Sequence, residues 1–395
     1  TSIKLDDKFN IKKSNVLLNG TQGLVRLMLG QKLRDEKQGL NTAGFVTGYR
    51  GSPLGAVDFQ MRRASKELLA SNIKFKEALN EDLATTALWG AQQAELRGEG
   101  LYDGVFGLWY GKGPGVDRSG DAMRHANMAG SSVNGGVLMA MGDDHSGESS
   151  TVLHQSDLAM IDAGMPILSP AGVQEILDYG YYGFALSRYS GLWVGLKTMK
   201  DTIEVTSVVD GDPFRMEFKN PEIKSASDNL NIRLVDTPAD QEKRLLSDKK
   251  TAAEDFARIN RIDKVGLPKL NSKIGLVAAG KNWLDLIHAL SLLGIDESEA
   301  KALGITSYKI VQTWPIDRQS LLEWADQLDL IIVIEEKRKI IETQIKDALF
   351  SIASKTRVYG GHKNDEYLFF DHGVLDPLDI ASALGQIFKE EGCSN

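Results

Sequence analysis

The chain has 395 residues, and its 46 Lys and Arg against 54 Asp and Glu give a formal charge of −8. At roughly 150 residues per domain, this length predicts two to three domains. The mild acidity argues against a nucleic-acid partner, because binding to phosphates requires a basic patch. No apolar run approaches the roughly 18 residues that span a bilayer, so we expect neither a membrane span nor a membrane partner.

Cys393 is the single cysteine of the chain. One thiol cannot form an intrachain disulfide, and a cysteine-ligated iron–sulfur cluster normally needs four thiolates. The first residues, TSIKLDDKFN, show no basic segment followed by an apolar one, so no secretory signal is visible. We therefore expect a cytoplasmic protein that builds no iron–sulfur cluster by itself.

The first half of the chain alternates short apolar runs with amphipathic stretches. The runs are bounded by turn residues and lack strict alternation, which is typical of parallel strands buried on both faces. The predicted strands are 44–49, 104–110, 135–142 and 165–170. The predicted helices are 54–70, 81–96, 121–128 and 173–187. Such alternation predicts an open, doubly wound α/β sheet.

A polar stretch, roughly 220–269, interrupts this pattern, and its simplest interpretation is a solvated linker with one or two surface helices. A second alternating set follows it. Its predicted strands are 273–280, 306–312, 328–336 and 355–361. The fold class expected is α/β, with two doubly wound, mostly parallel-sheet domains. The predicted boundaries are 1–235 for the first domain, 236–269 for a charged connector and 270–395 for the second domain.

The first glycine-rich run, GYRGSPLGAVD, lies between a predicted strand and a predicted helix. Open α/β sheets bind ligands at such turns, where glycines allow the backbone to approach the ligand. Gly51, Ser52 and Pro53 are the candidates. The alternative is a simple helix start, with Ser52 as N-cap and Pro53 at the first helical position.

The second run, GLWYGKGPGVDRSGDAMRHANMAG, places Gly111, Lys112 and Gly113 in a loop that a plain connection would not need. Several charged residues follow the loop. They are consistent either with a cavity for a cofactor or substrate, or with an ion-pair network at a subunit interface.

The third run, MGDDHSGESSTVLHQSD, follows another apolar strand and concentrates acids and histidines. It lacks any metal-ligand spacing, so we predict no metal site here. The segment is more consistent with the wall of an active site in which His145 steers or protonates a substrate. Glu81, at the predicted start of a helix, could simply complement the helix dipole.

Taken together, these runs resemble the indolepyruvate ferredoxin oxidoreductases, in particular the long single-chain form, within the thiamine-diphosphate-dependent 2-oxoacid:ferredoxin oxidoreductases. The matching segments are GYRGSPLG, ALNEDLATTALWGAQQ, WYGKGPGVDRSGDAMRHAN, GGVLMAMGDDHSGESSTVLHQSD, KIGLVAAGKNWLD, KIVQTWPID and VIEEKR. The resemblance extends over essentially the whole chain. It implies a pyrimidine-binding thiamine-diphosphate domain followed by a domain like the C-terminal domain of transketolase.

The resemblance also implies an activity and its partners. Members of this family oxidatively decarboxylate arylpyruvates such as indole-3-pyruvate, a 2-oxo acid, with coenzyme A as acceptor and ferredoxin as the protein they reduce. A homo-oligomer is expected. The chain has no G-D-G followed by Asn, the pattern that holds Mg²⁺ and the diphosphate, and no cysteine clusters for electron transfer. We therefore expect the Mg²⁺ and 4Fe–4S sites in segments outside this chain, and we expect the chain to be inactive alone.

The resemblance assigns roles to residues. Glu81 matches the carboxylate that hydrogen-bonds N1′ of the cofactor's aminopyrimidine and so promotes loss of the C2 proton. The predicted cofactor contacts are Gly51, Ser52, Pro53, Glu81, Gly111, Lys112 and Gly113. The predicted substrate contacts are Arg50, Asp143, Asp144 and His145, and His145 is also a predicted catalytic residue. Asp143 and Asp144 stand where pyruvate enzymes of the family place an arginine, which favours a different, bulkier acid.

Two alternatives remain open. The chain could be a transketolase-like or dehydrogenase E1-like thiamine enzyme component, since these proteins share both domain types. It could also be a non-catalytic module that only assembles or regulates a partner. The retained Glu81 argues against the second alternative, because such a module has no chemical reason to keep that carboxylate.

Overall fold

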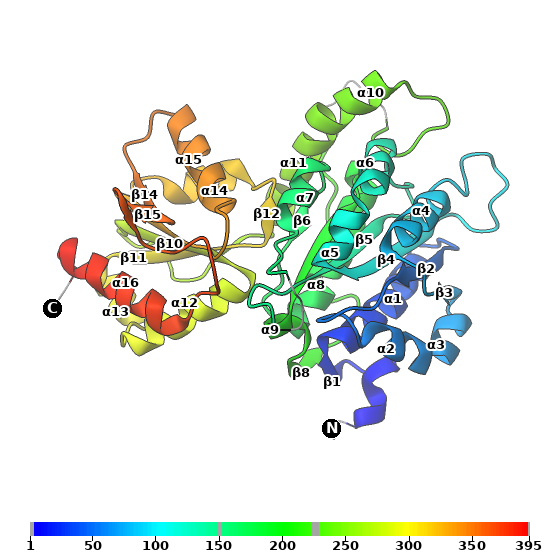
Figure 1. The fold of residues 1–395 in the computed structure, drawn as a ribbon, viewed down its shortest axis with the longest axis horizontal. Coiled ribbons are helices and arrows are strands. Elements are labelled where there is room, and N and C mark those ends of the chain that lie inside the picture. Colours follow the sequence, from blue (N-terminus) through cyan, green and yellow to red (C-terminus); the bar gives the residue numbers. More distant parts are fainter. Residues whose placement is uncertain (1–3, 149–151, 223–228, 394–395) are drawn as a thin grey trace. The chain divides into compact units, whose positions relative to one another are not determined.

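The structure is a computed structural model that describes residues 4–148, 152–222 and 229–393 (Figure 1). The chain forms two compact units, Thr1–Ile259 and Asn260–Asn395. The division lies inside the predicted connector. The predicted boundaries at 235 and 270 stay a prediction.

The first unit is built on a parallel sheet in the order β6-β7-β5-β4-β2-β3. Its strands are β2 (Ala43–Gly48), β3 (Ile73–Phe75), β4 (Val105–Lys112), β5 (Val137–Asp143), β6 (Ile167–Leu168) and β7 (Val194–Met199). Every residue of β5, the strand between β7 and β4, is buried. A strand buried on both sides explains why its sequence is continuously apolar instead of alternating.

Helices cover both faces of this sheet. On β4, the Phe106 ring meets Phe184 of α8 (Val173–Ser190) edge-on, with 5.8 Å between ring centres. Trp109 points to the other face, where its Nε1 donates to the Glu81 carbonyl of α4 (Glu81–Ala91) at 3.1 Å. The layer of α8 also contains α1 (Gly20–Lys37), and the layer of α4 contains α6 (Gly120–Ala129). Shorter helices are α2 (Val57–Arg63), α3 (Ser65–Ala70), α5 (Gly113–Arg118), α7 (Asp157–Asp162) and α9 (Lys200–Ile203).

A separate antiparallel pair joins β1 (Asn15–Asn19), near the start of the first unit, to β8 (Thr206–Asp210), which follows β7 and α9. The buried side chain of Arg26 holds this region together. Its guanidinium donates to the carbonyl of Gly211 at 3.1 Å and to that of Lys8, in the short 3₁₀ helix η1 (Leu5–Phe9), at 3.1 Å.

The segment predicted as a connector contains regular structure. It forms α10 (Pro238–Lys243), the π-helical turn η2 (Arg244–Lys249) and α11 (Lys250–Asn260). The buried Phe256 ring lies 5.2 Å from the centre of Tyr182 and 5.3 Å from that of Tyr189, both on α8. The high fraction of charged residues thus belongs to the solvated face of α11, while its other face packs on the first unit.

The second unit contains a sheet in the order β14-β13-β10-β11-β9, parallel except for β9. Its strands are β9 (Lys264–Val265), β10 (Ile274–Ala279), β11 (Ile305–Ile310), β13 (Leu330–Ile334) and β14 (Arg357–Tyr359). Shorter strands are β12 (Gln312–Trp314), β15 (His362–Lys363) and β16 (Glu366–Tyr367).

Apolar clusters cover both faces of this second sheet. Leu276 belongs to the cluster with α12 (Gly280–Leu292) and α16 (Pro377–Glu390), whereas its neighbour Val277 belongs to the cluster with α14 (Arg318–Ala325) and α15 (Ile341–Ser351). A further helix, α13 (Glu297–Leu303), contributes Ala300 to the first cluster. The predicted fold class, two doubly wound and mostly parallel α/β domains, is confirmed.

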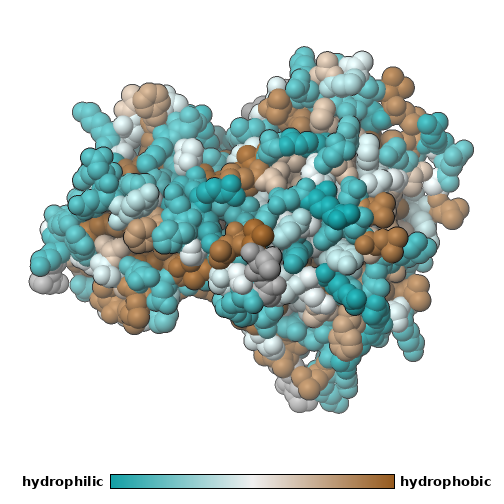
Figure 2. Space-filling view, in the orientation of Figure 1, coloured by the Kyte–Doolittle hydropathy of each residue, from teal (hydrophilic) through white to brown (hydrophobic). Residues whose placement is uncertain are grey.

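The helices of the described residues can be compared with membrane spans in length and hydropathy. None of the helices formed by the described residues has the length and apolar character needed to cross a bilayer. Figure 2 shows apolar side chains in separate groups between hydrophilic ones on the face that it displays.

Candidate functional site

The predicted glycine runs meet at the carboxyl edge of the first unit's sheet. The strands β2, β4 and β5 are parallel neighbours, and they end at Gly48, Lys112 and Asp143. Because the carboxyl ends of parallel strands lie at one edge, the segments that follow them are neighbours. This is the position at which open α/β sheets bind ligands.

The loop that contains Gly51, Ser52 and Pro53 folds back on the ends of β4 and β5. A Cβ on Gly51 would lie 2.9 Å from Cδ of Lys112, and one on Gly142 would lie 2.9 Å from Cδ of Pro53. The peptide bond between Ser52 and Pro53 is cis. Helix α2 begins at Val57 with Ala56 as its N-cap, so the alternative that Ser52 caps this helix is wrong.

The prediction that Gly111, Lys112 and Gly113 of the second glycine run form a loop is wrong, because Gly111 and Lys112 end β4 and Gly113 is the first residue of α5. A Cβ on Gly113 would lie 2.3 Å from Nδ1 of His154, and one on Gly115 would lie 2.5 Å from Cγ and Oε1 of Glu81. Only glycine allows α5 to approach both side chains so closely. The first turns of α5 thus lie between Glu81 on one side and His154 on the other. Gly111 packs against the ring of Trp109 in the same way.

Several charged residues of this run form ion pairs. His154 Nε2 lies 2.7 Å from Asp117, Arg124 pairs with Asp162, and His125 lies 3.6 Å from Asp121. These contacts are those expected of an ion-pair network. Lys112 and Arg50 form no ion pair with the described residues.

Glu81 is the first residue of α4, and its backbone is fixed by several hydrogen bonds. The Asn80 side chain caps the helix by accepting from the Leu83 amide at 2.8 Å. The Ala78 amide donates to the Gly48 carbonyl at 3.1 Å, which ties this segment to the end of β2. The Glu81 carbonyl accepts from Trp109 Nε1 at 3.1 Å and from the Thr85 hydroxyl at 3.0 Å.

The carboxylate of Glu81 has no such partners. The residue is only 8% exposed, yet none of the described residues donates a hydrogen bond to its oxygens or forms an ion pair with them. A carboxylate on a buried residue is normally paired or hydrogen-bonded, because an unpaired charge is costly to desolvate. An acid on a buried residue, without a hydrogen-bond partner among the described residues and in a ligand-binding position, is therefore a candidate for function.

Asp143, at the end of β5, is fully buried and saturated with partners. It accepts from the backbone amide of Ser156 at 3.0 Å and from its hydroxyl at 2.5 Å. His154 Nδ1 lies 3.6 Å away, and His145 Nε2 and Lys197 Nζ each lie 3.9 Å away. Burial alone would raise the pKa of Asp143, but His154 and then Lys197 outweigh it and hold that pKa below its ordinary value.

His154 is the functional candidate that the sequence prediction missed. Burial alone would lower its pKa, but hydrogen bonds with Asp143 and Asp117 outweigh burial and raise it. The imidazole ring of His154 therefore connects β5, α5 and the Gly113 turn. Asp117 lies 37 positions before it in the sequence, so no local spacing could have indicated the pair.

The remaining predicted side chains lie along the segment after β5. Asp144 is buried, and its Oδ1 accepts from the amides of Gly147 at 2.9 Å and Glu148 at 3.2 Å, so it shapes the turn. His145 is 2% exposed, whereas Arg50 is exposed on the first loop. Their substrate contacts, and that of Asp143, stay a prediction.

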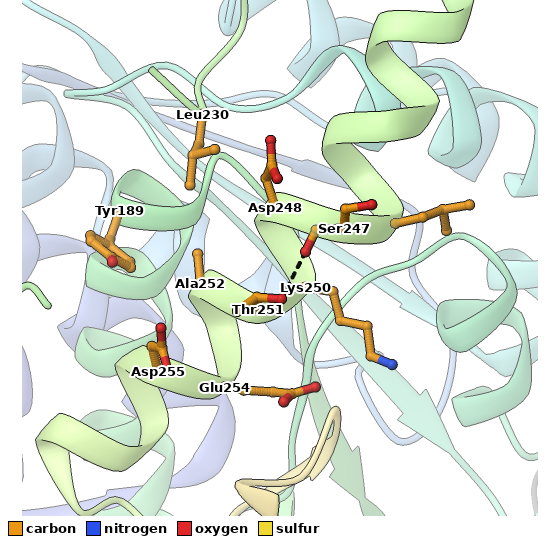
Figure 3. A pocket seen from close by; sticks show the side chains of 10 residues that line it. Tyr189, Leu230, Ser247, Asp248, Lys250, Thr251, Ala252, Glu254 and Asp255 are labelled. Carbon is orange, nitrogen blue, oxygen red and sulfur yellow. Dashed lines mark hydrogen bonds between the residues drawn. The ribbon is translucent and has the colours of Figure 1, made fainter. Parts of the chain in front are cut away.

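The described residues contain no group of three His, Cys, Asp or Glu arranged to hold a metal ion. A pocket of about 390 Å³ lies elsewhere, on η2 and α11, and Figure 3 shows Tyr189 at its side. None of the predicted site residues lines it. Its Thr251 hydroxyl donates to the Ser247 carbonyl at 2.8 Å, so this wall is ordinary helix surface.

Comparisons with known proteins identify relatives of the chain. The family model described as the indolepyruvate oxidoreductase domain matches residues 264–395. The chain is 25% identical over 364 residues to the indolepyruvate oxidoreductase subunit IorA of Pyrococcus horikoshii, covering 91% of this chain and 51% of that subunit. It is 23% identical to the IorA subunit of Methanothermobacter marburgensis, and the match covers 80% of this chain and 47% of that subunit.

Solved structures show the same fold. The 2-oxoglutarate:ferredoxin oxidoreductase from Magnetococcus marinus, solved with 2-oxoglutarate, coenzyme A and succinyl-CoA, has a TM-score of 0.67 at 14% identity, covering 95% of this chain and 66% of that one. A split-gene transketolase, described as an inactive tetramer of four beta subunits, has a TM-score of 0.55 at 12% identity. The match covers 93% of this chain and 98% of that one.

These comparisons confirm the resemblance to indolepyruvate oxidoreductases. The chain spans about half the length of the curated relatives that it matches.

Proposed function

We propose that this chain, a relative of indolepyruvate oxidoreductase subunits, is the pyrimidine-binding half of a thiamine-diphosphate-dependent oxidoreductase. The proposed enzyme oxidatively decarboxylates arylpyruvates of the indolepyruvate type, with coenzyme A as acceptor and ferredoxin as electron acceptor. The names of the relatives support the reaction class. The fold shared with a 2-oxoacid:ferredoxin oxidoreductase and a transketolase supports the domain assignment.

The observation that carries the proposal is the carboxylate of Glu81, on a residue that is only 8% exposed, which accepts from none of the described residues. A carboxylate in this position can share a proton with N1′ of the pyrimidine ring, and the exclusion of water strengthens that hydrogen bond. Gly115 permits the close packing that orients Glu81, because any side chain there would displace it. Trp109 and Thr85 fix its backbone.

The residues present fit the pyrimidine half of the cofactor. The loop of Gly51, Ser52 and Pro53 and the junction of β4 with α5 at Gly111, Lys112 and Gly113 lie at the carboxyl edge, and we propose that they line its binding site. When bound, thiamine diphosphate supplies the nucleophilic carbon that attacks the 2-oxo acid. The chain's own contribution is to orient the ring, exclude water and hold a proton between Glu81 and N1′.

The proposed activity requires groups from outside these 395 residues. We assign Mg²⁺, the diphosphate site and the 4Fe–4S clusters to the remaining half of the enzyme. Because the cofactor is divided between two halves, we expect the chain alone to be inactive. Robust ferredoxin or dye reduction by the isolated chain, supplied with thiamine diphosphate, Mg²⁺, coenzyme A and indolepyruvate, would contradict this division.

The central test is Glu81→Gln in the complete enzyme, with Asp82→Asn as its control on the same helical turn. We expect Glu81→Gln to slow exchange of the cofactor's C2 proton and turnover by about 10²–10⁴-fold, the usual contribution of a positioned acid–base group. The melting temperature should not fall, because the carboxylate loses no hydrogen bond. Asp82→Asn should behave as wild type.

Unchanged proton exchange in Glu81→Gln would overturn the proposal. It would favour the alternative of a module that only assembles or regulates its partner.

A further inference from the structure

Arg34, in the last turn of α1, is held between two aromatic rings. Its guanidinium carbon lies 5.5 Å from the centre of the Tyr181 ring and 5.1 Å from that of Phe218. Its Nη1 donates to the carbonyl of Met216 at 2.9 Å and to that of Pro213. These contacts fix the plane of the guanidinium and attach the segment after β8 to α1.

The other edge of this guanidinium, formed by Nε and Nη2, makes no hydrogen bond with the described residues. Neither atom is among the enclosed polar atoms. Packing and attraction to the negative end of the helix explain why a cation is here, but they do not explain why this edge remains open. The Nε–Nη2 edge presents two parallel donors, the geometry that matches a carboxylate or phosphate.

Arg34 lines two pockets, of about 320 Å³ and about 310 Å³. Both are lined by Arg34, Gln38 and Phe218. The first pocket also has the rings of Tyr181 and Tyr189 in its wall. A guanidinium edge beside several aromatic rings suits an anion that carries a planar apolar group.

The charge of the pockets favours an anion. The cations in their walls are Arg34, Lys37 and Arg188, against a single acid, Glu217. Arg188 is neutralised by a bidentate pair with the buried Asp35, at 2.7 and 2.9 Å. Lys37 forms no ion pair among the described residues, and its Nζ lies 4.1 Å from the centre of the Phe214 ring.

These pockets are separate from the Glu81 site. Helix α1 ends at Lys37, and β2 begins at Ala43, so this end of α1 lies at the amino edge of the sheet. Glu81 follows β3 and lies at the carboxyl edge. A ligand at Arg34 therefore does not depend on the proposed cofactor.

We propose that the pockets around Arg34 bind a small aromatic oxyanion, whose carboxylate or phosphate pairs with the Nε–Nη2 edge while its ring packs against Phe218. Lys37 supplies a second positive charge at the rim. Arg34 confers the geometric specificity, since lysine has the same charge but no fork of parallel donors.

The test is calorimetric titration of the chain with benzoate, phenyl phosphate and, as a cation of similar size, benzylamine. We expect one or both anions to bind with a dissociation constant of about 1 mM or lower, and benzylamine not to bind. Binding of benzoate alone identifies a carboxylate ligand, and binding of phenyl phosphate alone identifies a phosphate ligand.

Variants locate the binding site. Arg34→Lys should weaken the anion that binds by about tenfold or more, equivalent to about 1.4 kcal/mol. Lys37→Met should weaken it several-fold, because it removes the second positive charge, and Lys66→Met, at an exposed lysine on α3, should have no effect. The proposal is overturned if neither anion binds at 10 mM (about tenfold above the expected constant), if benzylamine binds equally well, or if both Arg34→Lys and Lys37→Met bind as wild type.

Discussion

Each unit buries a glutamate beside the carboxyl edge of its sheet, but the two carboxylates differ in their partners. Glu335 follows β13, and its oxygens accept from the backbone amides of Ile340 at 3.0 Å, Ile341 at 2.9 Å and Glu342 at 3.2 Å. Glu81 is the first residue of α4 and is exposed to a similar extent, 8% against 9%, but its carboxylate accepts from none of the described residues.

The difference separates a structural acid from a functional candidate. Glu335 satisfies the amides that α15 leaves unpaired at its first turn, so folding alone explains it. Burial raises its pKa to about 7 in spite of these donors. Glu81 also lies in the first turn of its helix, where its charge complements the helix dipole, but its carboxylate accepts from none of the described amides. Burial and charge are common to both sites, and the hydrogen-bond partners distinguish them.

The largest effect on stability should come from Glu335→Ala. Buried donors left without an acceptor cost about 1–3 kcal/mol each, so we expect the free energy of unfolding to fall by about 3 kcal/mol or more. Asp347→Ala, which removes an exposed acid from the same helix, should change it by less than about 0.5 kcal/mol. Urea unfolding measures both. An equally small loss in the two variants would remove the distinction drawn above.

The packing of Glu81 can be disturbed without replacing it. Gly115→Ala places a Cβ 2.5 Å from Cγ and Oε1 of Glu81, so the carboxylate must move. We expect activity of the complete enzyme to fall by about tenfold or more, or about 1.4 kcal/mol in the barrier. The control is Gly120→Ala on α6, where a Cβ would contact nothing within 4 Å. It should keep full activity, and a matching loss in the control would argue against the role of Glu81.

Helix caps allow a matched comparison of the two units. Asn80 caps α4 through the Leu83 amide at 2.8 Å, and Asp296 caps α13 through the Glu299 amide at 2.9 Å. Alanine at either position should cost about 1 kcal/mol of stability. Only Asn80→Ala should also lower the activity, because it loosens the turn that carries Glu81. Equal activities at matched stability would show that the turn's geometry is unimportant.

The smallest effect concerns the pH dependence of stability. The pKa of His154 is raised in the folded chain, so its contribution is fully present below the ordinary value, about 6.5, and is lost as the pH rises through the raised pKa. His154→Gln should remove this decline between neutral and mildly alkaline pH. His125→Gln, at an exposed histidine, serves as control. Thermal melts across pH are the measurement, and an unchanged profile in His154→Gln would refute the assignment.

Sequence patterns were sufficient to predict the fold class, and they also indicated where the candidate site residues lie along the chain. Continuous apolar runs predicted strands that correspond to β2, β4, β5, β10, β11 and β13. This was possible because a strand buried on both faces has a continuously apolar sequence. The same pattern placed Glu81 and the three glycine runs at strand ends. The residue-level resemblance supplied the expected chemistry.

Which of these side chains have hydrogen-bond or ion-pair partners could be learned only from the three-dimensional structure. His154 meets Asp117 and the Gly113 turn across distant segments, and Asp143 is enclosed by residues from separate loops. The helices of the predicted connector pack through rings on α8 that no local pattern relates to them. The physical reason is that burial and hydrogen bonding depend on residues that folding brings together, so only the three-dimensional structure shows that none of the described residues pairs with the Glu81 carboxylate.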